Sequence, residues 1–282
     1  MNVFSEIEPF RSYVKEKKEN GKTIGFIPTM GSLHEGHLSL IKLAQEKTDE
    51  VIVSIYVNPE QFGPDEDFEE YPRELESDLQ KCREHGVSTV FTPSDEVMYG
   101  YTQYLRIEID ELNTYMDGGS RPGFFEGILL IVNKLFNIVQ PDIAVFGQKD
   151  IQQFLILQQM VAEFNHHVEL VMGPIARAND GLALSSRNVY LSEQERQMAP
   201  ALYRSLQYIQ KQISDGVATP KLLLEHQKSE LEAKGLEIDY LNVFAKKTLS
   251  PVETLIKKQQ YIIAGAVWLG NTRLIDNILI EF

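Results

Sequence analysis

The chain has 282 residues, of which 43% are hydrophobic and 24% charged, with a formal net charge of −14. This length suits one large domain or two modest ones, and the acidic balance argues against a nucleic-acid-binding protein. The sequence has no apolar run near the ~20 residues of a membrane span, no signal-peptide core at its N-terminus, and Cys82 as its single cysteine, which excludes an internal disulfide. We therefore expect a cytoplasmic protein without nucleic-acid or membrane partners.

The first elements predict a βαβ unit. Residues 5–20 have the pattern of an amphipathic helix, and Ile24–Ile27 is a short buried-strand run that Pro28 is expected to end. A helix should follow, with Leu33, Leu40, Ile41 and Ala44 on its buried face, and residues 51–56 (VIVSIY) predict a second buried strand. Strand, helix and strand in this order imply a parallel sheet.

The alternation continues to about residue 171. Helices are expected at residues 73–85, 125–139 and 151–164, and strands at 87–91, 104–109, 143–146 and 168–171. This order predicts a doubly wound, Rossmann-like α/β domain, in which ligands bind beyond the carboxyl ends of the strands.

The pattern changes after Pro174. Helices are expected at residues 192–214 and 220–233, and two or three strands, near 237–244 and 261–270, close the chain. We therefore predict a domain at residues 1–175 and a smaller C-terminal α+β domain at 176–282, which would act as a lid.

The turn and helix start at residues 29–37 have the most informative chemistry. Gly31 permits a tight turn at Met30, and Ser32 followed by Glu35 predicts a capping box that starts the helix. His34 and His37 would then share one face of its first turn. The unpaired N–H groups of a helix N-terminus attract phosphate, and two imidazoles beside them could donate hydrogen bonds to a triphosphate.

Two alternative roles for this histidine pair remain open. Two histidines at this spacing are often solvated surface residues, and they can also be two ligands of a metal ion. Zinc is disfavoured, because Cys82 is the only cysteine and no third ligand lies at helical spacing.

Three further blocks follow predicted strands or the predicted boundary. Asn58 and Gln61 offer neutral donors and acceptors for hydroxyls and a carboxylate, although a plain Asn-Pro turn is the alternative. In GQKD, Lys149 could neutralise phosphate and Asp150 could bind ribose or simply cap a helix. Arg187 in LSSRN could stabilise charge on a leaving group, or belong to a serine-rich linker.

The decapeptide PTMGSLHEGH at residues 28–37 resembles the nucleotide-binding signature of the pantoate–β-alanine ligase (pantothenate synthetase) family. It is similar, more broadly, to the His-x-Gly-His motif of nucleotidyl-transferring and adenylate-forming enzymes. Five ordered blocks from Pro28 to Asn188 match the family pattern, but Phe124 stands where the family usually has His and Gln148 where it more often has Glu.

The resemblance implies an ATP-dependent ligase that joins pantoate to β-alanine through pantoyl adenylate. It implies catalytic roles for His34, His37, Lys149 and Arg187, and substrate contacts from Gln61, Gln153 and Asn58. The implied ATP contacts are Met30, Gly31, Ser32, Leu33, His34, Glu35, Gly36, His37, Gly147, Gln148, Lys149, Asp150, Ala176, Leu184, Ser185, Ser186 and Arg187. The family also implies Mg²⁺, for which the sequence identifies no ligand, and a homodimer.

Two other functions remain possible at this point. A nucleotidyltransferase with a phosphorylated acceptor would need a basic acceptor pocket, whereas Gln61 and Gln153 are neutral. A non-catalytic nucleotide sensor would tolerate loss of Lys149 or Arg187, and both are present.

Overall fold

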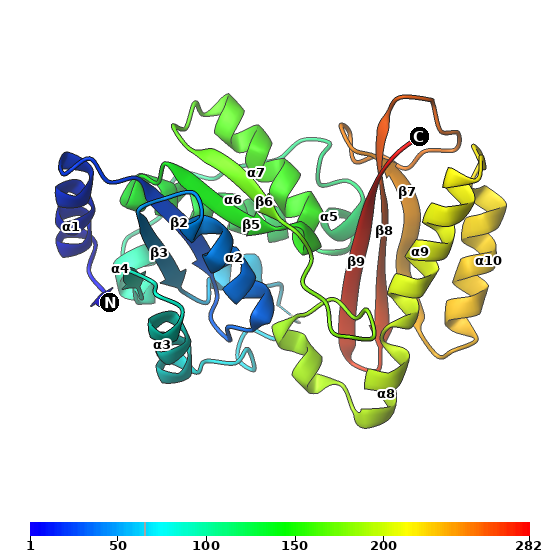
Figure 1. The fold of residues 1–282 in the computed structure, drawn as a ribbon, viewed down its shortest axis with the longest axis horizontal. Coiled ribbons are helices and arrows are strands. Elements are labelled where there is room, and N and C mark those ends of the chain that lie inside the picture. The colour runs from blue at the N-terminus through cyan, green and yellow to red at the C-terminus, as the bar shows by residue number, and fades with distance from the viewer. Residues whose placement is uncertain (65) are drawn as a thin grey trace. The chain divides into compact units, whose positions relative to one another are not determined.

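The structure, a computed structural model, describes residues 1–64 and 66–282 (Figure 1). They form two compact units. The first unit comprises Met1–Glu108, Gly123–Gln148 and Gln153–Pro174, and the second comprises Ile109–Pro122, Lys149–Gln152 and Ile175–Phe282. The second unit thus includes two segments of the predicted N-terminal domain. The division into domains 1–175 and 176–282, and the lid role, stay predictions.

Helices (α, and 3₁₀ turns η) and strands (β) alternate along the first unit. In chain order, the elements of the whole chain are β1 (Asn2–Phe4), α1 (Ile7–Glu19), β2 (Ile24–Thr29), α2 (Glu35–Gln45), β3 (Glu50–Ile55), η1 (Pro59–Gln61), α3 (Leu75–Glu84), β4 (Thr89–Phe91), α4 (Asp95–Tyr99), α5 (Met116–Ser120), α6 (Phe124–Val139), β5 (Ile143–Gly147), η2 (Gln148–Asp150), α7 (Ile151–Glu163), β6 (Glu169–Gly173), η3 (Ser186–Tyr190), α8 (Glu193–Met198), α9 (Ala201–Ser214), α10 (Lys221–Glu232), β7 (Glu237–Ala245), β8 (Gln260–Leu269) and β9 (Thr272–Glu281). No helix of the described residues is long and apolar enough to cross a membrane.

The sheet of the first unit has six parallel strands in the order β1-β4-β3-β2-β5-β6. From β2 the chain builds outward through β3 to β4, and then returns to the other side of β2 to add β5 and β6. The strand order therefore reverses between β2 and β5, which is a topological switch point. The predicted doubly wound α/β fold is confirmed.

The central strands are apolar because helices cover them. Phe26 of β2 and Ile52 of β3 are fully buried and lie opposite each other in the ladder. Helix α2 packs against β2, β3 and β5 through a face that includes Ile41 and Ala44, and it lies in front of the sheet in Figure 1. Parallel strands buried in this way have continuous apolar sequences, which is why they were predictable.

The predicted end of the first strand at Pro28 is wrong, because β2 continues to Thr29. Successive residues of a strand direct their N–H and C=O groups alternately toward the two neighbouring strands. The N–H and C=O groups of Ile24 bond to Asp142, just before β5. Pro28 faces the same side, where β5 no longer pairs with β2 beyond Phe26. The missing N–H of proline therefore costs no ladder hydrogen bond.

The strand predicted at residues 104–109 is also wrong, since residues 102–110 have no regular secondary structure. Tyr104 and Leu105 are 89% and 85% exposed. A segment in which apolar and polar residues alternate becomes a strand only where a neighbouring strand shares its backbone hydrogen bonds. None of the described strands pairs with this segment. Conversely, the three-residue edge strand β1 was too short to predict.

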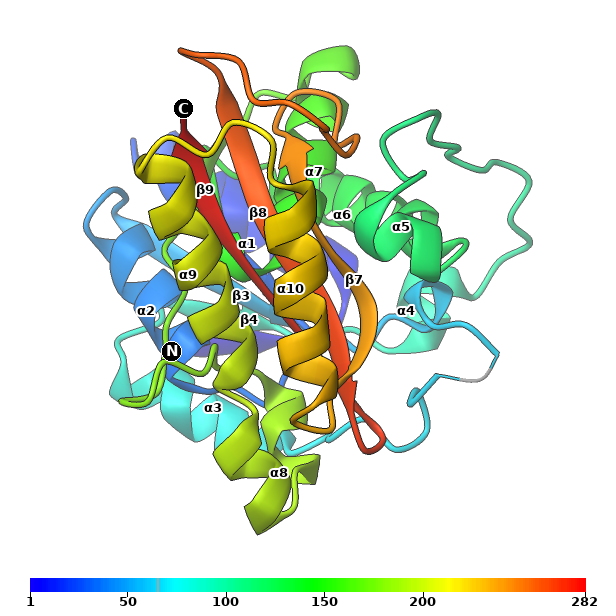
Figure 2. The same ribbon diagram turned by 90° about the vertical axis from the view of Figure 1, so that its right-hand side faces the viewer.

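The second unit contains a three-stranded antiparallel sheet, β7-β8-β9, with α9 and α10 packed side by side on it (Figure 2). Leu206 and Ile209 of α9 are fully buried with Ile263 and Val267 of β8. The single helix predicted at residues 192–214 is two helices, α8 and α9. Pro200 lies between them, where a proline cannot donate to the preceding turn.

Segment 109–122 is fastened to this sheet by a buried ion cluster. Arg273 of β9 contacts Asp239 of β7 at 2.6 Å and Asp117 of α5 at 2.7 Å. Burial alone would lower the pKa of this guanidinium, but the two carboxylates outweigh it and the pKa is raised. Burial also raises the pKa of the neighbouring Tyr240 hydroxyl. These ion pairs attach residues 109–122 to the second unit, although the residues on either side of them in the sequence belong to the first unit.

Candidate active site

The switch point brings two predicted blocks together in the first unit. The turn with residues 30–37 follows β2. Strand β5, the direct neighbour of β2, ends at Gly147 and is followed by Gln148. Both blocks therefore leave the sheet at the carboxyl ends of adjacent strands, where an open α/β sheet binds its ligands.

The turn after β2 has two residues in left-handed conformations, Gly31 (φ 82°) and Ser32 (φ 50°). Asp78 of α3 stabilises it. Its carboxylate accepts hydrogen bonds from the backbone N–H of Ser32 at 2.8 Å and of Leu33 at 2.7 Å. Lys81, one turn along α3, donates to the Leu33 carbonyl at 2.7 Å. Helix α3 thus holds the turn through hydrogen bonds to two of its backbone N–H groups and to one of its backbone carbonyls.

The sequence did not identify Asp78 as part of the site. The side chain is 1% exposed, yet within RELESDLQKCREH it is one of several acidic residues that a solvated helix would also have. Its position is decided by the tertiary packing of α3 against the turn, and no local signal records that packing.

The predicted capping box of Ser32 and Glu35 is wrong. Helix α2 begins at Glu35 with His34 as its N-cap, and Glu35 is exposed. Nδ1 of His34 accepts the Gly36 N–H at 3.1 Å, and Nδ1 of His37 accepts the His34 N–H at 3.3 Å. The two histidines form the reciprocal cap that serine and glutamate were expected to form.

This cap fixes the chemistry of both imidazoles. A ring nitrogen that accepts a backbone N–H carries no proton, so the hydrogen bonds assign the neutral tautomers with the proton on Nε2. The rings of His34 and His37 lie with their centroids 4.2 Å apart. Each side chain therefore combines an accepting Nδ1 toward the backbone with a donating Nε2–H.

Gln61 is oriented by a chain of hydrogen bonds that starts at Tyr99. The Tyr99 hydroxyl donates to Oδ1 of Asn58 at 2.7 Å, and Nδ2 of Asn58 donates to Oε1 of Gln61 at 3.2 Å. Burial raises the pKa of Tyr99 and keeps its hydroxyl protonated as a donor. Because Oε1 of Gln61 is engaged, the amide end that Gln61 has to offer a ligand is its NH₂ group.

Asn58 is 1% exposed and also donates to the Gly127 carbonyl at 3.2 Å. These bonds describe a positioning role, and its direct contact with substrate stays a prediction. Gly127 permits the arrangement, because a Cβ there would lie 1.9 Å from the Glu60 carbonyl oxygen. Helix α6 and turn η1 are therefore in direct backbone contact.

Several predicted site residues lie in the second unit. Lys149, 22% exposed at its side chain, contacts Asp150 at 3.5 Å. Ala176 and Leu184 form the base of a short hairpin, in which the Leu184 N–H donates to the Ala176 carbonyl at 2.9 Å. Ser185 caps the 3₁₀ turn η3, which contains Ser186 and Arg187. Gln153 belongs to the first unit, on the first turn of α7.

Arg177 lies in the same hairpin and is a basic residue close to a glycine, Gly181. The structure places it in a bidentate ion pair with the buried Asp276, at 2.6 and 2.8 Å.

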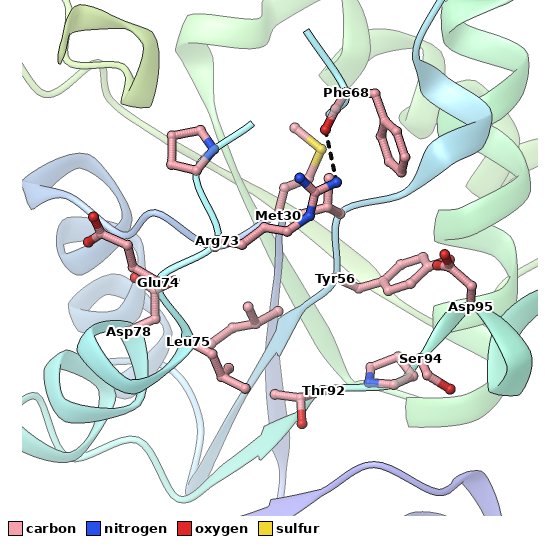
Figure 3. Close-up of a pocket in the computed structure, with 15 residues that line it drawn as sticks. Met30, Tyr56, Phe68, Arg73, Glu74, Leu75, Asp78, Thr92, Ser94 and Asp95 are labelled. Carbon is pink, nitrogen blue, oxygen red and sulfur yellow. Dashed lines mark hydrogen bonds between the residues drawn. The ribbon is translucent and has the colours of Figure 1, made fainter. Parts of the chain in front are cut away.

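A cavity of roughly 320 Å³ opens beside the turn, at the carboxyl ends of β2, β3 and β4 (Figure 3). Of the described residues that line it, Met30 and Gly31 alone belong to the predicted site. Across it, the Tyr56 hydroxyl donates to Asp95 at 2.7 Å and Arg73 donates to the Phe68 carbonyl at 2.8 Å. Burial, and then the hydrogen bond to Asp95, raise the pKa of Tyr56.

The fold and the turn together define a class. This is a doubly wound α/β protein with a histidine-capped helix at its switch point, an arrangement typical of nucleotide-binding sites.

The chain belongs to the pantoate–β-alanine ligase family, whose model, described as Pantoate-beta-alanine ligase, matches residues 2–279. It is 48% identical to the pantothenate synthetase of Carboxydothermus hydrogenoformans, over 100% of this chain and 99% of that one. The crystal structure of pantothenate synthetase from Thermus thermophilus superposes with a TM-score of 0.91 at 38% identity, covering 99% of each chain. Pantoate-beta-alanine ligase from Francisella tularensis, complexed with beta-gamma ATP and beta-alanine, superposes with a TM-score of 0.83 at 33% identity, over 99% of this chain and 97% of that one.

The role of Asp78 predicts the effect of Asp78→Asn. An amide keeps one acceptor but turns an NH₂ group toward a backbone N–H, so one buried N–H loses its partner. We expect the free energy of unfolding to fall by about 1–3 kcal/mol, measured by urea denaturation. Glu76→Gln, an exposed change on the same helix, is the control and should leave stability unchanged. Equal stability of both variants would contradict the role of Asp78.

Proposed function

We propose that this protein condenses pantoate with β-alanine at the expense of ATP, through a pantoyl-adenylate intermediate, giving pantothenate, AMP and pyrophosphate. One observation carries the proposal: the reciprocal cap of His34 and His37 at the N-terminus of α2, at the switch point of the sheet. Membership of the pantoate–β-alanine ligase family supports the identity of the substrates.

The first step forms a bond between the pantoate carboxylate oxygen and the α-phosphorus of ATP, and breaks the bond from that phosphorus to the β-phosphate oxygen. Charge accumulates on the departing pyrophosphate. The Nε2–H groups of His34 and His37, beside the positive end of α2, would donate to these oxygens. Lys149 would add a point charge, because an ammonium can follow phosphate oxygens as they move.

In the second step the β-alanine amine attacks the acyl carbon, the bond to AMP breaks, and the amine loses a proton. The acyl substrate must stay in place between the two steps. The NH₂ group of Gln61, oriented through Asn58, suits a hydroxyl or carboxylate oxygen of pantoate. Gln153 would supply the second amide.

We propose the remaining ATP contacts because of the chemistry of their side chains and backbone groups and because they match the sequence pattern of the family. Gly147, Gln148 and Asp150 would lie along the ribose and phosphates, and Ala176 and Leu184 offer backbone groups at the base of their hairpin. Ser185, Ser186 and Arg187 would contact the phosphates, with Arg187 stabilising the leaving pyrophosphate.

Mg²⁺ is proposed to enter with ATP. No group of three or more His, Cys, Asp or Glu side chains that could hold a metal ion occurs among residues 1–64 and 66–282. This agrees with the usual mode of Mg²⁺ binding, in which substrate phosphates and water supply most ligands. The ion would neutralise phosphate charge. Exchange of pyrophosphate that persists in excess EDTA would contradict this requirement.

We also propose a homodimer. Tyr104 and Leu105 are almost fully exposed on a segment without regular secondary structure, and exposed apolar side chains gathered in one place indicate an interface. Sedimentation of the parent and of Tyr104→Ser/Leu105→Ser tests this. A monomeric parent would refute the dimer, and a double variant that stays dimeric would refute this surface as its interface.

The cytoplasm is the proposed location, on the basis of the single, fully buried and unpaired thiol of Cys82. Cell fractionation tests it, and recovery outside the cytoplasmic fraction would refute it.

Exchange of labelled pyrophosphate into ATP tests the function. We expect exchange that requires pantoate and Mg²⁺ but not β-alanine, since the first step is complete without the amine. Exchange without any carboxylate would indicate a different reaction. Its absence under all conditions would indicate a nucleotide-binding protein without this chemistry.

The two nitrogens of His37 can be tested separately. In His37→Asn, the side-chain oxygen can accept a hydrogen bond where Nδ1 lies, but no group replaces the Nε2–H donor. His37→Ala loses both the acceptor and the donor. We expect His37→Asn and His37→Ala to slow exchange by about 10²–10³-fold, the scale of one lost transition-state donor. Only His37→Ala should also lose stability, by about 1 kcal/mol, through loss of the cap. Parent-like exchange in His37→Asn would exclude Nε2 from the reaction.

Gln61 and Gln153 are predicted to recognise pantoate. Gln61→Glu keeps the acceptor for Asn58 but replaces the donating NH₂ with a charged oxygen, and Gln153→Ala removes the second amide. Loss of such a partner costs about 1–3 kcal/mol, so the KM for pantoate should rise about 5- to 150-fold while the KM for ATP stays unchanged. Gln207→Glu, an exposed change on α9, is the matched control. A defect confined to ATP would contradict this role.

A further inference from the structure

Strand β9 contains two adjacent buried polar residues, Asp276 and Asn277, which are 4% and 2% exposed. A buried polar pair in the middle of a strand requires hydrogen-bond partners, and these partners identify its role. Adjacent side chains on a strand point to opposite faces of the sheet, so the pair engages two different segments of the second unit.

Asn277 engages the segment with Lys149. Its Nδ2 donates to the Lys149 backbone carbonyl at 3.0 Å. At the other end of this short segment, the amide of Gln152 donates to the carbonyls of Leu112 and Tyr115, both at 2.9 Å, and accepts the Gly118 N–H at 3.3 Å. Residues 149–152 are therefore fixed at both ends by side-chain amides.

Asp276 engages the hairpin between Ala176 and Leu184. Its carboxylate forms the bidentate pair with Arg177, whose Nη1 also donates to the Gly181 carbonyl at 3.0 Å. The guanidinium lies 3.6 Å from the ring centroid of Tyr203 on α9. Arg177 thus ties the first arm of the hairpin to Asp276 and to the turn at Gly181, and this hairpin leads directly into Ser185–Arg187.

We propose that Asn277 and Asp276 are positioning residues, which set Lys149 and the Ser185–Arg187 turn for adenylate formation. Neither residue would touch a substrate. This inference rests on the proposed function, because it assigns to the pair the placement of that reaction's phosphate-side groups.

The position of a lysine ammonium depends on the position of the backbone that carries the side chain. The Lys149 side chain is long and flexible, so its reach depends on the position of its Cα, which the Asn277 bond to the adjoining carbonyl fixes. A displacement of about 1 Å in a reacting group can cost about 10²-fold in rate.

Asn277→Asp gives the sharpest test. The variant keeps the shape of the side chain but turns an oxygen toward the Lys149 carbonyl, which repels it. We expect pantoate-dependent pyrophosphate exchange to slow by about 10²-fold, with an unchanged KM for pantoate. Gln227→Ala is the control, because Gln227 is likewise a buried amide of the second unit, bonded to Ser205 at 2.8 Å. It should lower the melting temperature without slowing exchange.

A double-mutant cycle separates positioning from general destabilisation. If Asn277 acts through Lys149, Asn277→Asp should have less than about a twofold effect in the Lys149→Ala background, whereas independent effects would multiply. Asp276→Asn should in the same way lose most of its effect in the Arg187→Ala background. Multiplicative losses in both cycles would overturn the proposal.

The remaining outcomes are also decisive. Parent-like exchange by Asn277→Asp overturns the role of Asn277. If the variant fails to fold, Asn277→Ser replaces it, and failure of both to fold while Gln227→Ala folds assigns Asn277 a structural role and overturns the inference. A parent protein that shows no pantoate-dependent exchange refutes the proposed function itself, which distinguishes the two failures.

Discussion

The pairing of β2 with β5 is the constraint on which the candidate site depends. Because the chain first builds away from β2 on one side and later returns to its other side, the segments that follow these two adjacent strands start at the carboxyl edge of the sheet, where such folds bind their ligands. The turn after β2 and the start of η2 after β5 are placed there by the topology alone. The specific chemistry comes afterwards, from the side chains that fix each of these backbone segments.

Much of this frame was predictable from sequence, for identifiable reasons. The buried strands β2, β3 and β5 each contain a short run of apolar residues, and the histidine pair follows a strand and a turn within a short stretch of chain. These signals are local. The failed strand at residues 104–109 shows the limit of such reasoning, because alternation describes a strand's faces and says nothing about whether a neighbour exists to pair with it.

Two side chains that hold backbone segments of candidate-site residues were not predictable, because their roles depend on partners far away in sequence. Asp78 contacts residues 45 and 46 positions earlier, and Asn277 contacts a carbonyl 128 positions earlier. An aspartate on a helix or an asparagine in a strand has the same local sequence whether or not such a partner exists. Only its burial, once the fold is known, distinguishes a structural requirement from an ordinary solvated group.

The correction of the capping box changes the chemistry of the turn. A serine and glutamate cap could satisfy backbone N–H groups at a helix start, but a carboxylate has no N–H group to offer an anion. Glu35 is instead exposed at the first position of α2. The observed cap uses Nδ1 of His34 and His37 for the backbone, and makes the protonated Nε2 the donor of each ring. Among the natural side chains, neutral imidazole alone combines a ring acceptor with a ring donor on opposite sides. A histidine at each position of the cap therefore accepts a backbone N–H and still has a ring N–H donor, which is the group that the proposed function assigns to the phosphates.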